Sequence, residues 1–166
     1  RAKGEKKVHD IVTYKTTLGA EPCNQLLFVH AFTGCDTTSS FHGIGKGTAL
    51  KLFINTTSFK EISGVFYNAS ATHRDVKEAG EKAALIIYKS TNKTINQTRL
   101  SYLSKKVIKA TSFVKPESRP PTSSSLMFHS LRTYYQVITW LGNTLNAENW
   151  GWTKEENAFS PKTTYD

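Results

Sequence analysis

One short stretch of the sequence, TGCDTTSSFHGIGK (residues 33–46), combines a single carboxylate with a glycine-rich loop. Asp36 is its only acid, and six residues separate Asp36 from the first glycine of Gly43-Ile44-Gly45. Carboxylates are ligands for hard divalent cations, and backbone N–H groups at the start of a helix suit phosphate oxygens. This arrangement indicates chemistry on a phosphate-bearing ligand.

The glycine loop leads into a predicted helix over residues 46–53. Glycine accepts positive φ without a Cβ clash, so Gly43 and Gly45 allow a tight turn between two helices. Such a turn leaves N–H groups pointing outward beside the helix N-terminus, where the helix dipole favours an anion. Lys46 adds positive charge there, and Lys51 lies about one turn further on. The alternative is a glycine turn between packed helices that binds nothing.

The segment GIGKGTALKLF (residues 43–53) resembles the helix-hairpin-helix, a module that binds the DNA backbone without reading bases. Its usual form is close to GIGxxTAxxL, and the positions that match are Gly43, Ile44, Gly45, Thr48, Ala49 and Leu52. The resemblance implies contacts with nucleic-acid phosphates, for which the candidate residues are Gly43, Ile44, Gly45, Lys46, Gly47, Thr48 and Lys51.

Residues 8–66 resemble the flap endonuclease superfamily of structure-specific, PIN-like nucleases. Apolar residues 26–29 correspond to a helix that ends in the turn Gly34-Cys35-Asp36, and the hairpin follows at the family's spacing. The resemblance implies that Asp36 is catalytic and a metal ligand, one of several carboxylates that hold Mg²⁺ or Mn²⁺ for phosphodiester hydrolysis. The family's other acids lie mostly on strands upstream of this segment, which this sequence lacks, and Thr37 replaces a common aromatic residue. We therefore expect this chain alone to be inactive.

The sequence contains other arrangements of reactive side chains. The spacing C-x6-H-x4-C-x6-H lacks the close pairs of a structural zinc site, and its members are Cys23, His30, Cys35 and His42. A cysteine nucleophile at Cys35 would need a histidine from a sequence neighbour, which rarely points the right way. Aromatic residues of the predicted helix 127–141 are expected to be core, although they are also of the type that stacks on single-stranded nucleic acid.

The hydrophobic pattern predicts a mainly α protein, a multi-helical segment. The family resemblance implies that this segment is the C-terminal part of an α/β PIN-like nuclease fold. Helices are expected over 6–17, from 22 to about 33, over 46–53 and over 127–141. Three more helices are expected after N-terminal capping signals, which are a capping box at Ser58 and Glu61, a second box at Thr72 and Asp75, and a cap at Thr98. The expected buried positions include Leu26, Leu27, His30, Ile62, Phe66, Val76, Ala83, Leu100, Leu103 and Val107.

Composition changes near the middle of the chain. The stretch KPESRPPTSSS (residues 115–125) contains three prolines and four serines, which is typical of a linker or surface strap. The predicted organisation is therefore a helical part over 1–112 that includes the hairpin at 33–53, a linker over 113–125, and a C-terminal helix and tail over 126–166. Trp150 and Trp152 are expected to attach the tail to the body.

The charge of the chain bears on its partners. Lys and Arg number 22 against 13 Asp and Glu, a formal net charge of +9. Such a surplus favours polyanionic partners, with nucleic acid first and an anionic membrane surface second. The family resemblance narrows the nucleic acid to duplex or branched DNA. No apolar run is long enough for a membrane span. Two cysteines suggest a reducing compartment, so we expect an intracellular, nuclear protein.

A non-catalytic nucleic-acid-binding module and a protein–protein interaction domain of a mobile-element-derived protein remain alternatives, because the block HAFTGCDT resembles animal proteins carrying HA-x-TGCDT.

Overall fold

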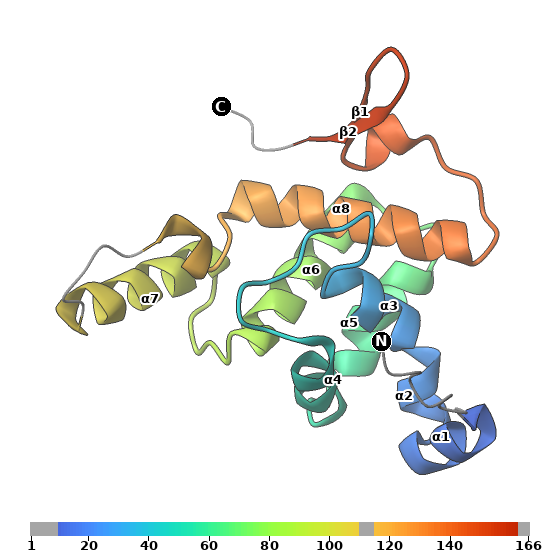
Figure 1. Cartoon of the computed structure of the whole chain (residues 1–166), viewed down its shortest axis with the longest axis horizontal. Helices are drawn as coiled ribbons and strands as arrows, with labels where there is room; N and C mark the ends of the chain where they lie inside the picture. The colour runs from blue at the N-terminus through green and yellow to red at the C-terminus, as the bar shows by residue number, and fades with distance from the viewer. Residues whose placement is uncertain (1–9, 110–114, 163–166) are drawn as a thin grey trace, which may run out of the picture.

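The computed structural model describes residues 10–109 and 115–162, and this part of the chain is mainly helical (Figure 1). The α-helices are Ile11–Leu18 (α1), Ala20–Asn24 (α2), Leu26–Phe32 (α3), Lys46–Ile54 (α4), Phe59–Tyr67 (α5), His73–Ile87 (α6), Ile95–Lys109 (α7) and Ser123–Trp140 (α8). Two 3-10 turns lie at Pro116–Ser118 (η1) and Ala147–Trp150 (η2), and strands Trp152–Lys154 (β1) and Phe159–Pro161 (β2) form an antiparallel pair.

Several helices begin at side chains that satisfy the first free backbone donors. Asp10 Oδ1 accepts from the N–H groups of Val12 and Thr13 at the start of α1. The predicted box at Thr72 and Asp75 is confirmed at the start of α6, since each side chain accepts from the other residue's N–H. Helix α8 starts one turn before the predicted 127, because Thr122 accepts from Ser125 N–H and caps it.

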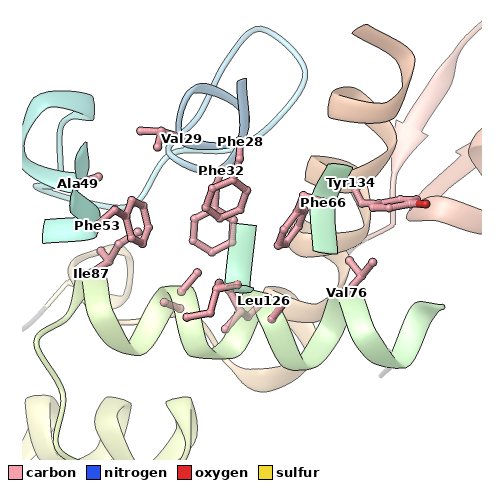
Figure 2. Packing of buried hydrophobic residues seen from close by; sticks show 14 of the residues in the cluster. Phe28, Val29, Phe32, Ala49, Phe53, Phe66, Val76, Ile87, Leu126 and Tyr134 are labelled. Carbon is pink, nitrogen blue, oxygen red and sulfur yellow. The ribbon is translucent and has the colours of Figure 1, made fainter. Parts of the chain in front are cut away.

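The core lies where α3, α5 and α6 pack against α8, with α5 also packed against α6 (Figure 1). Phe28 of α3 is fully buried, and its ring centroid lies 5.1 Å from Phe32, 5.7 Å from Phe53 and 4.5 Å from Phe66. Figure 2 shows these rings above α6, with Val76 and Leu126 on the same cluster. Aromatic rings bury large apolar areas, so this cluster supplies much of the stability of a small core.

Helices α6 and α8 lie in close contact at Gly80. A Cβ built on Gly80 would lie 1.9 Å from the hydroxyl oxygen of Ser130 and 2.6 Å from Ser130 Cβ. Both residues are buried, and the Ser130 hydroxyl donates to Leu126 O within its own helix. The two central helices can therefore pack this closely only because residue 80 has no side chain.

Three positions of the buried face predicted for the helix that starts at Pro22 are wrong. The segment is divided at Gln25 into α2 and α3, and the exposed residues are Leu26, Leu27 and His30. The side that packs inward carries Phe28, Val29, Ala31 and Phe32. Two apolar sets compete for burial on this short helix, and the set with two phenylalanines buries the larger area.

The predicted start of α5 after Ser58 is confirmed, because α5 begins at Phe59, but its capping box and the predicted cap at Thr98 are wrong. The Ser58 side chain makes no capping bond at the start of α5, so the expected box with Glu61 does not form. Thr98 lies inside α7, which begins at Ile95. Leu100 and Val107 of α7 are exposed rather than buried, because α7 packs along α6 and bonds to residues 118–123 on other sides of the helix.

The Pro- and Ser-rich segment is more ordered than a linker. It contains η1, Pro120 is fully buried, and residues 123–125 form the first turn of α8. Helix α8 then packs on α3, α5 and α6 as part of one core. In the tail, Trp150 packs against Tyr134, with ring centroids 4.3 Å apart, as predicted.

Candidate nucleic-acid interface

The predicted glycine turn lies on the surface at the start of α4. We define the hairpin surface as Gly43, Gly45, Lys46, Gly47 and Thr48, all of which are exposed. Gly43 has φ +73°, and Ile44 N–H donates to Phe41 O, so a tight turn precedes the helix as predicted. A Cβ added at Gly43, Gly45 or Gly47 would meet no atom within 4 Å, so a ligand can approach this backbone closely.

The first turn of α4 presents unpaired backbone donors. Gly45 caps the helix without a side-chain bond, and the first intrahelical bond runs from Ala49 N–H to Gly45 O. Within the described ranges, the N–H groups of Lys46, Gly47 and Thr48 have no acceptor. Together with the helix dipole, these donors form the kind of site that binds an anion.

The two lysines proposed for phosphate contact differ in position. Lys46 Nζ donates to Gly34 O at 2.6 Å, so one hydrogen of its ammonium holds the loop and two remain for a ligand. Lys51 is exposed but lies about 140° around the helix from Lys46. A phosphate at the N-terminus of α4 is therefore closer to Lys46.

The hairpin is not a turn between two adjacent helices. The residues between Phe32 and Lys46 form a long loop, which passes over α8 before it descends to α4 (Figure 1). We call residues 33–45 the connecting loop. Ile44, a candidate DNA contact, packs partly buried against the core and anchors the loop. The predicted turn and the helix after it are present, while the helix before the turn, α3, ends at Phe32 and is separated from Gly43 by ten residues of loop.

Residues of the TGCDT motif hold the connecting loop in place. Thr38 Oγ1 donates to Ala31 O at 2.5 Å, and Thr37 Oγ1 donates to Gln136 Oε1 of α8 at 2.5 Å. Gly34 has φ +107°, a conformation that favours glycine, and an added Cβ would lie 2.8 Å from Ser40 Cα. These contacts explain the motif as a structural element that positions the hairpin surface.

Sequence reasoning missed a histidine that fixes the same loop from α8. His129 is buried, and its Nε2 lies 2.9 Å from Phe32 O while its Nδ1 lies 3.1 Å from Ser39 Oγ. A carbonyl only accepts, so Nε2 carries the proton and Nδ1 accepts from the Ser39 hydroxyl. Burial lowers the pKa of His129 to about 4, which keeps the ring neutral. Nothing in the sequence around His129, which lies on a largely apolar helix three positions before Arg132, indicates this role.

Asp36 lies exposed in the connecting loop, and within the described ranges it makes no hydrogen bond or ion pair. The described residues contain no group of three or more His, Cys, Asp or Glu side chains that could hold a metal ion. A two-metal site needs several carboxylates. The residues described here therefore do not fit the Mg²⁺ or Mn²⁺ site that the family resemblance implies, and Asp36 supplies one carboxylate only.

The other arrangements are also resolved by geometry. Cys23, His30, Cys35 and His42 do not form a metal-binding group. The Cys35 thiol lies 3.3 Å from Thr37 Oγ1 and 3.2 Å from Thr38 Oγ1, so its partners are hydroxyls rather than a histidine. His30 is not a core residue, because it is exposed and stacks on the partly exposed ring of Trp140. Tyr134 is fully buried, as expected for a core aromatic residue, whereas the expectation is wrong for Trp140, which is 41% exposed.

Replacing Gly34 by alanine should displace the connecting loop. The new Cβ would overlap Ser40 and the backbone would remain at φ +107°, so we expect a loss of about 2 kcal/mol in the free energy of unfolding. Urea denaturation measures this loss. Gly45→Ala is the matched control and should cost less, about 0.5–1 kcal/mol for an alanine at the N-cap of α4, because its φ is −85° and the added methyl meets nothing. Equal stability of the two variants would contradict the structural role of Gly34.

Comparisons of the chain with family models, with curated proteins and with solved structures found no match. The relationship to the flap endonuclease superfamily and the PIN-like origin of the fold therefore stay predictions from the motif. Over residues 10–109 and 115–162, no helix has both the length and the apolar character that a bilayer span requires.

Proposed function

We propose that the protein binds the phosphate backbone of duplex or branched DNA through the hairpin surface. The observation that carries the proposal is the set of free N–H groups at Lys46, Gly47 and Thr48, on a surface where glycines leave the backbone open. Backbone N–H groups at a helix N-terminus bind phosphate without reading bases, so the expected binding is independent of sequence.

Charge supports the same partner. The formal net charge of +9 favours a polyanion through release of its counterions. Lys46 is the first residue of α4 and adds a positive charge at this end of the helix, where its ammonium donates to Gly34 O. The absence of a side chain at Gly45 and Gly47 lets a phosphate reach the backbone directly.

A titration of fluorescent branched duplex at several salt concentrations tests this proposal with two variants. In Gly45→Val the new side chain covers the backbone donors, and in Lys46→Glu a carboxylate faces the phosphate. Each variant should bind at least about tenfold more weakly than the wild type. The slope of log affinity against log salt should fall by about one for Lys46→Glu, the loss of roughly one phosphate contact.

Lys77→Glu is the control, since it makes the same change in net charge at an exposed position near the start of α6. It should keep most of the affinity. Equal affinities for the wild type, Gly45→Val and Lys46→Glu would refute the hairpin surface, and binding without salt dependence would favour a protein-interaction domain. Circular dichroism should confirm that Gly45→Val is folded, as its φ of −85° and open surroundings lead us to expect.

Metal-dependent cleavage by a longer protein is a separate proposal. It needs carboxylates in addition to Asp36, together with Mg²⁺ or Mn²⁺. If a version with those acids cleaves branched DNA, Asp36→Ala should abolish the cleavage and leave binding in the absence of metal ions unchanged. Retained cleavage would remove Asp36 from the mechanism.

A further inference from the structure

A small polar pocket of about 180 Å³ lies directly beside the hairpin surface. Three separate parts of the chain form it: the connecting loop, the end of α6, and the segment from η1 into α8. The lining side chains that matter here are Ser40, His42, Tyr88, Arg119 and Ser125. His42 is the residue immediately before Gly43, so the pocket and the hairpin surface are continuous along the chain.

The lining is suited to an anion. It includes one guanidinium, two imidazoles and several hydroxyls, and it includes no carboxylate. Burial raises the pKa of Tyr88 to about 12, so its hydroxyl remains a donor at neutral pH. The neutral His129 accepts the Ser39 proton, which leaves the other hydroxyl donors of the lining to serve a ligand.

Arg119 is the main cation of this pocket. Its Nε atom is buried and has no hydrogen-bond partner among the described residues. Leaving a buried donor unpaired costs about 1–3 kcal/mol, more for a charged group, so such a group calls for a partner. The backbone around it is fixed, because Arg119 N–H donates to Pro116 O, Pro120 is buried, and Arg99 donates to Pro120 O. The guanidinium is thus held at the pocket by an ordered segment.

We infer that this pocket binds a terminal phosphate of a nucleic-acid strand whose backbone lies on the hairpin surface. A volume of 180 Å³ is below the roughly 300 Å³ of sites for larger organic ligands, so it suits a phosphate rather than a nucleoside. An arginine with neighbouring hydroxyls matches the three acceptor oxygens and the double charge of a phosphate monoester. That the phosphate belongs to a nucleic acid rests on the proposed function, because His42 of the pocket directly precedes Gly43 of the hairpin surface.

The test compares branched duplexes whose ends carry a 5′-phosphate, a 3′-phosphate or only hydroxyls. The wild type should bind one of the phosphorylated forms about tenfold more tightly than the hydroxyl form. Arg119→Gln should lose this preference, and Ser125→Ala should reduce it. Arg74→Gln removes an exposed arginine from α6 and should keep the preference. Equal affinity for all three ends in the wild type would overturn the inference.

Two further measurements separate this inference from the hairpin proposal. Gly45→Val should weaken binding of all three duplexes while the ratio between phosphorylated and hydroxyl ends persists. Inorganic phosphate should raise the melting temperature of the wild type and Arg74→Gln but not of Arg119→Gln, even if the hairpin surface binds no DNA. A phosphoserine peptide that binds more tightly than the phosphorylated duplex would overturn the assignment to nucleic acid.

Discussion

Gly80→Ala should destabilise the protein by about 3 kcal/mol, although the same change in an exposed helix usually stabilises it by roughly 1 kcal/mol. The reason is the crossing of α6 and α8, where a new Cβ would lie 1.9 Å from Ser130 Oγ and 2.6 Å from Ser130 Cβ. Rotating the serine hydroxyl relieves only the first overlap. The helices must therefore separate, and packing lost along their contact adds to the cost. Thermal unfolding should show a melting temperature lower by about 6–12 °C.

Two further variants isolate this crossing. Gly64→Ala changes an exposed glycine inside α5 with nothing within 4 Å of the new methyl, and it should be neutral or slightly stabilising. The double variant Gly80→Ala with Ser130→Gly removes the opposing Cβ and should recover a large part of the loss. If Gly80→Ala proves as stable as the wild type, the close approach of α6 and α8 is wrong.

The second large effect is a dependence of stability on pH through His129. Its pKa is lowered from 6.5 to about 4 in the folded state, chiefly by burial, and the nearby Arg132 charge acts in the same direction. Below pH 6.5 the unfolded chain takes up a proton that the folded chain does not, so stability decreases as the pH falls. The decrease between pH 7.5 and pH 4.5 should be about 2–3 kcal/mol from this residue alone.

Comparison with His129→Gln isolates the contribution of this residue from that of the carboxylates. The variant should be less stable than the wild type at pH 7.5, because the bridge between Phe32 O and Ser39 is impaired. The difference between the two proteins, measured by urea denaturation, should shrink by about 2–3 kcal/mol at pH 4.5. His42→Gln, in the exposed part of the connecting loop, should change stability little. A difference that stays constant with pH would contradict the neutral, buried state of His129.

Local signals in the sequence predicted several elements well. The box at Thr72 and Asp75 fixed the start of α6, because its two reciprocal hydrogen bonds need only residues three apart. Ser58 and Glu61 have the same spacing but form no box, since the backbone at Ser58 has φ −80° and ψ 1° rather than the extended conformation of a cap. Whether a capping motif forms thus depends on how the chain enters the helix, which tertiary packing decides.

The orientation of α3 could not be predicted from its pattern. Leu26, Leu27 and His30 lie on one side and Phe28 and Phe32 on another, so hydrophobicity alone permits either face to be buried. The choice follows from the partners, because the rings of α3 meet those of α4 and α5 from elsewhere in the chain. Burial of the aromatic face is a property of the assembled core.

Part of the candidate site could be predicted from the sequence. The glycine turn before α4 and its open N-terminus follow from local chemistry at Gly43 and Gly45, and both are present. The loop contacts of His129 and the pocket at Arg119 were not predictable, because they join segments about 80 to 100 residues apart. A hydrophobic pattern within one segment cannot predict contacts between segments that are distant in the sequence.

The support of the connecting loop by α8 has a consequence for experiments that divide the chain. Thr37 and Ser39 are held by Gln136 and His129, so a fragment that ends before residue 123 retains the whole glycine motif but not its supports. Loss of DNA binding in such a fragment would reflect a misplaced hairpin, even though α8 itself need not touch DNA. The smallest unit in which the motif can be assayed therefore extends to Trp140, well beyond the residues that resemble the family.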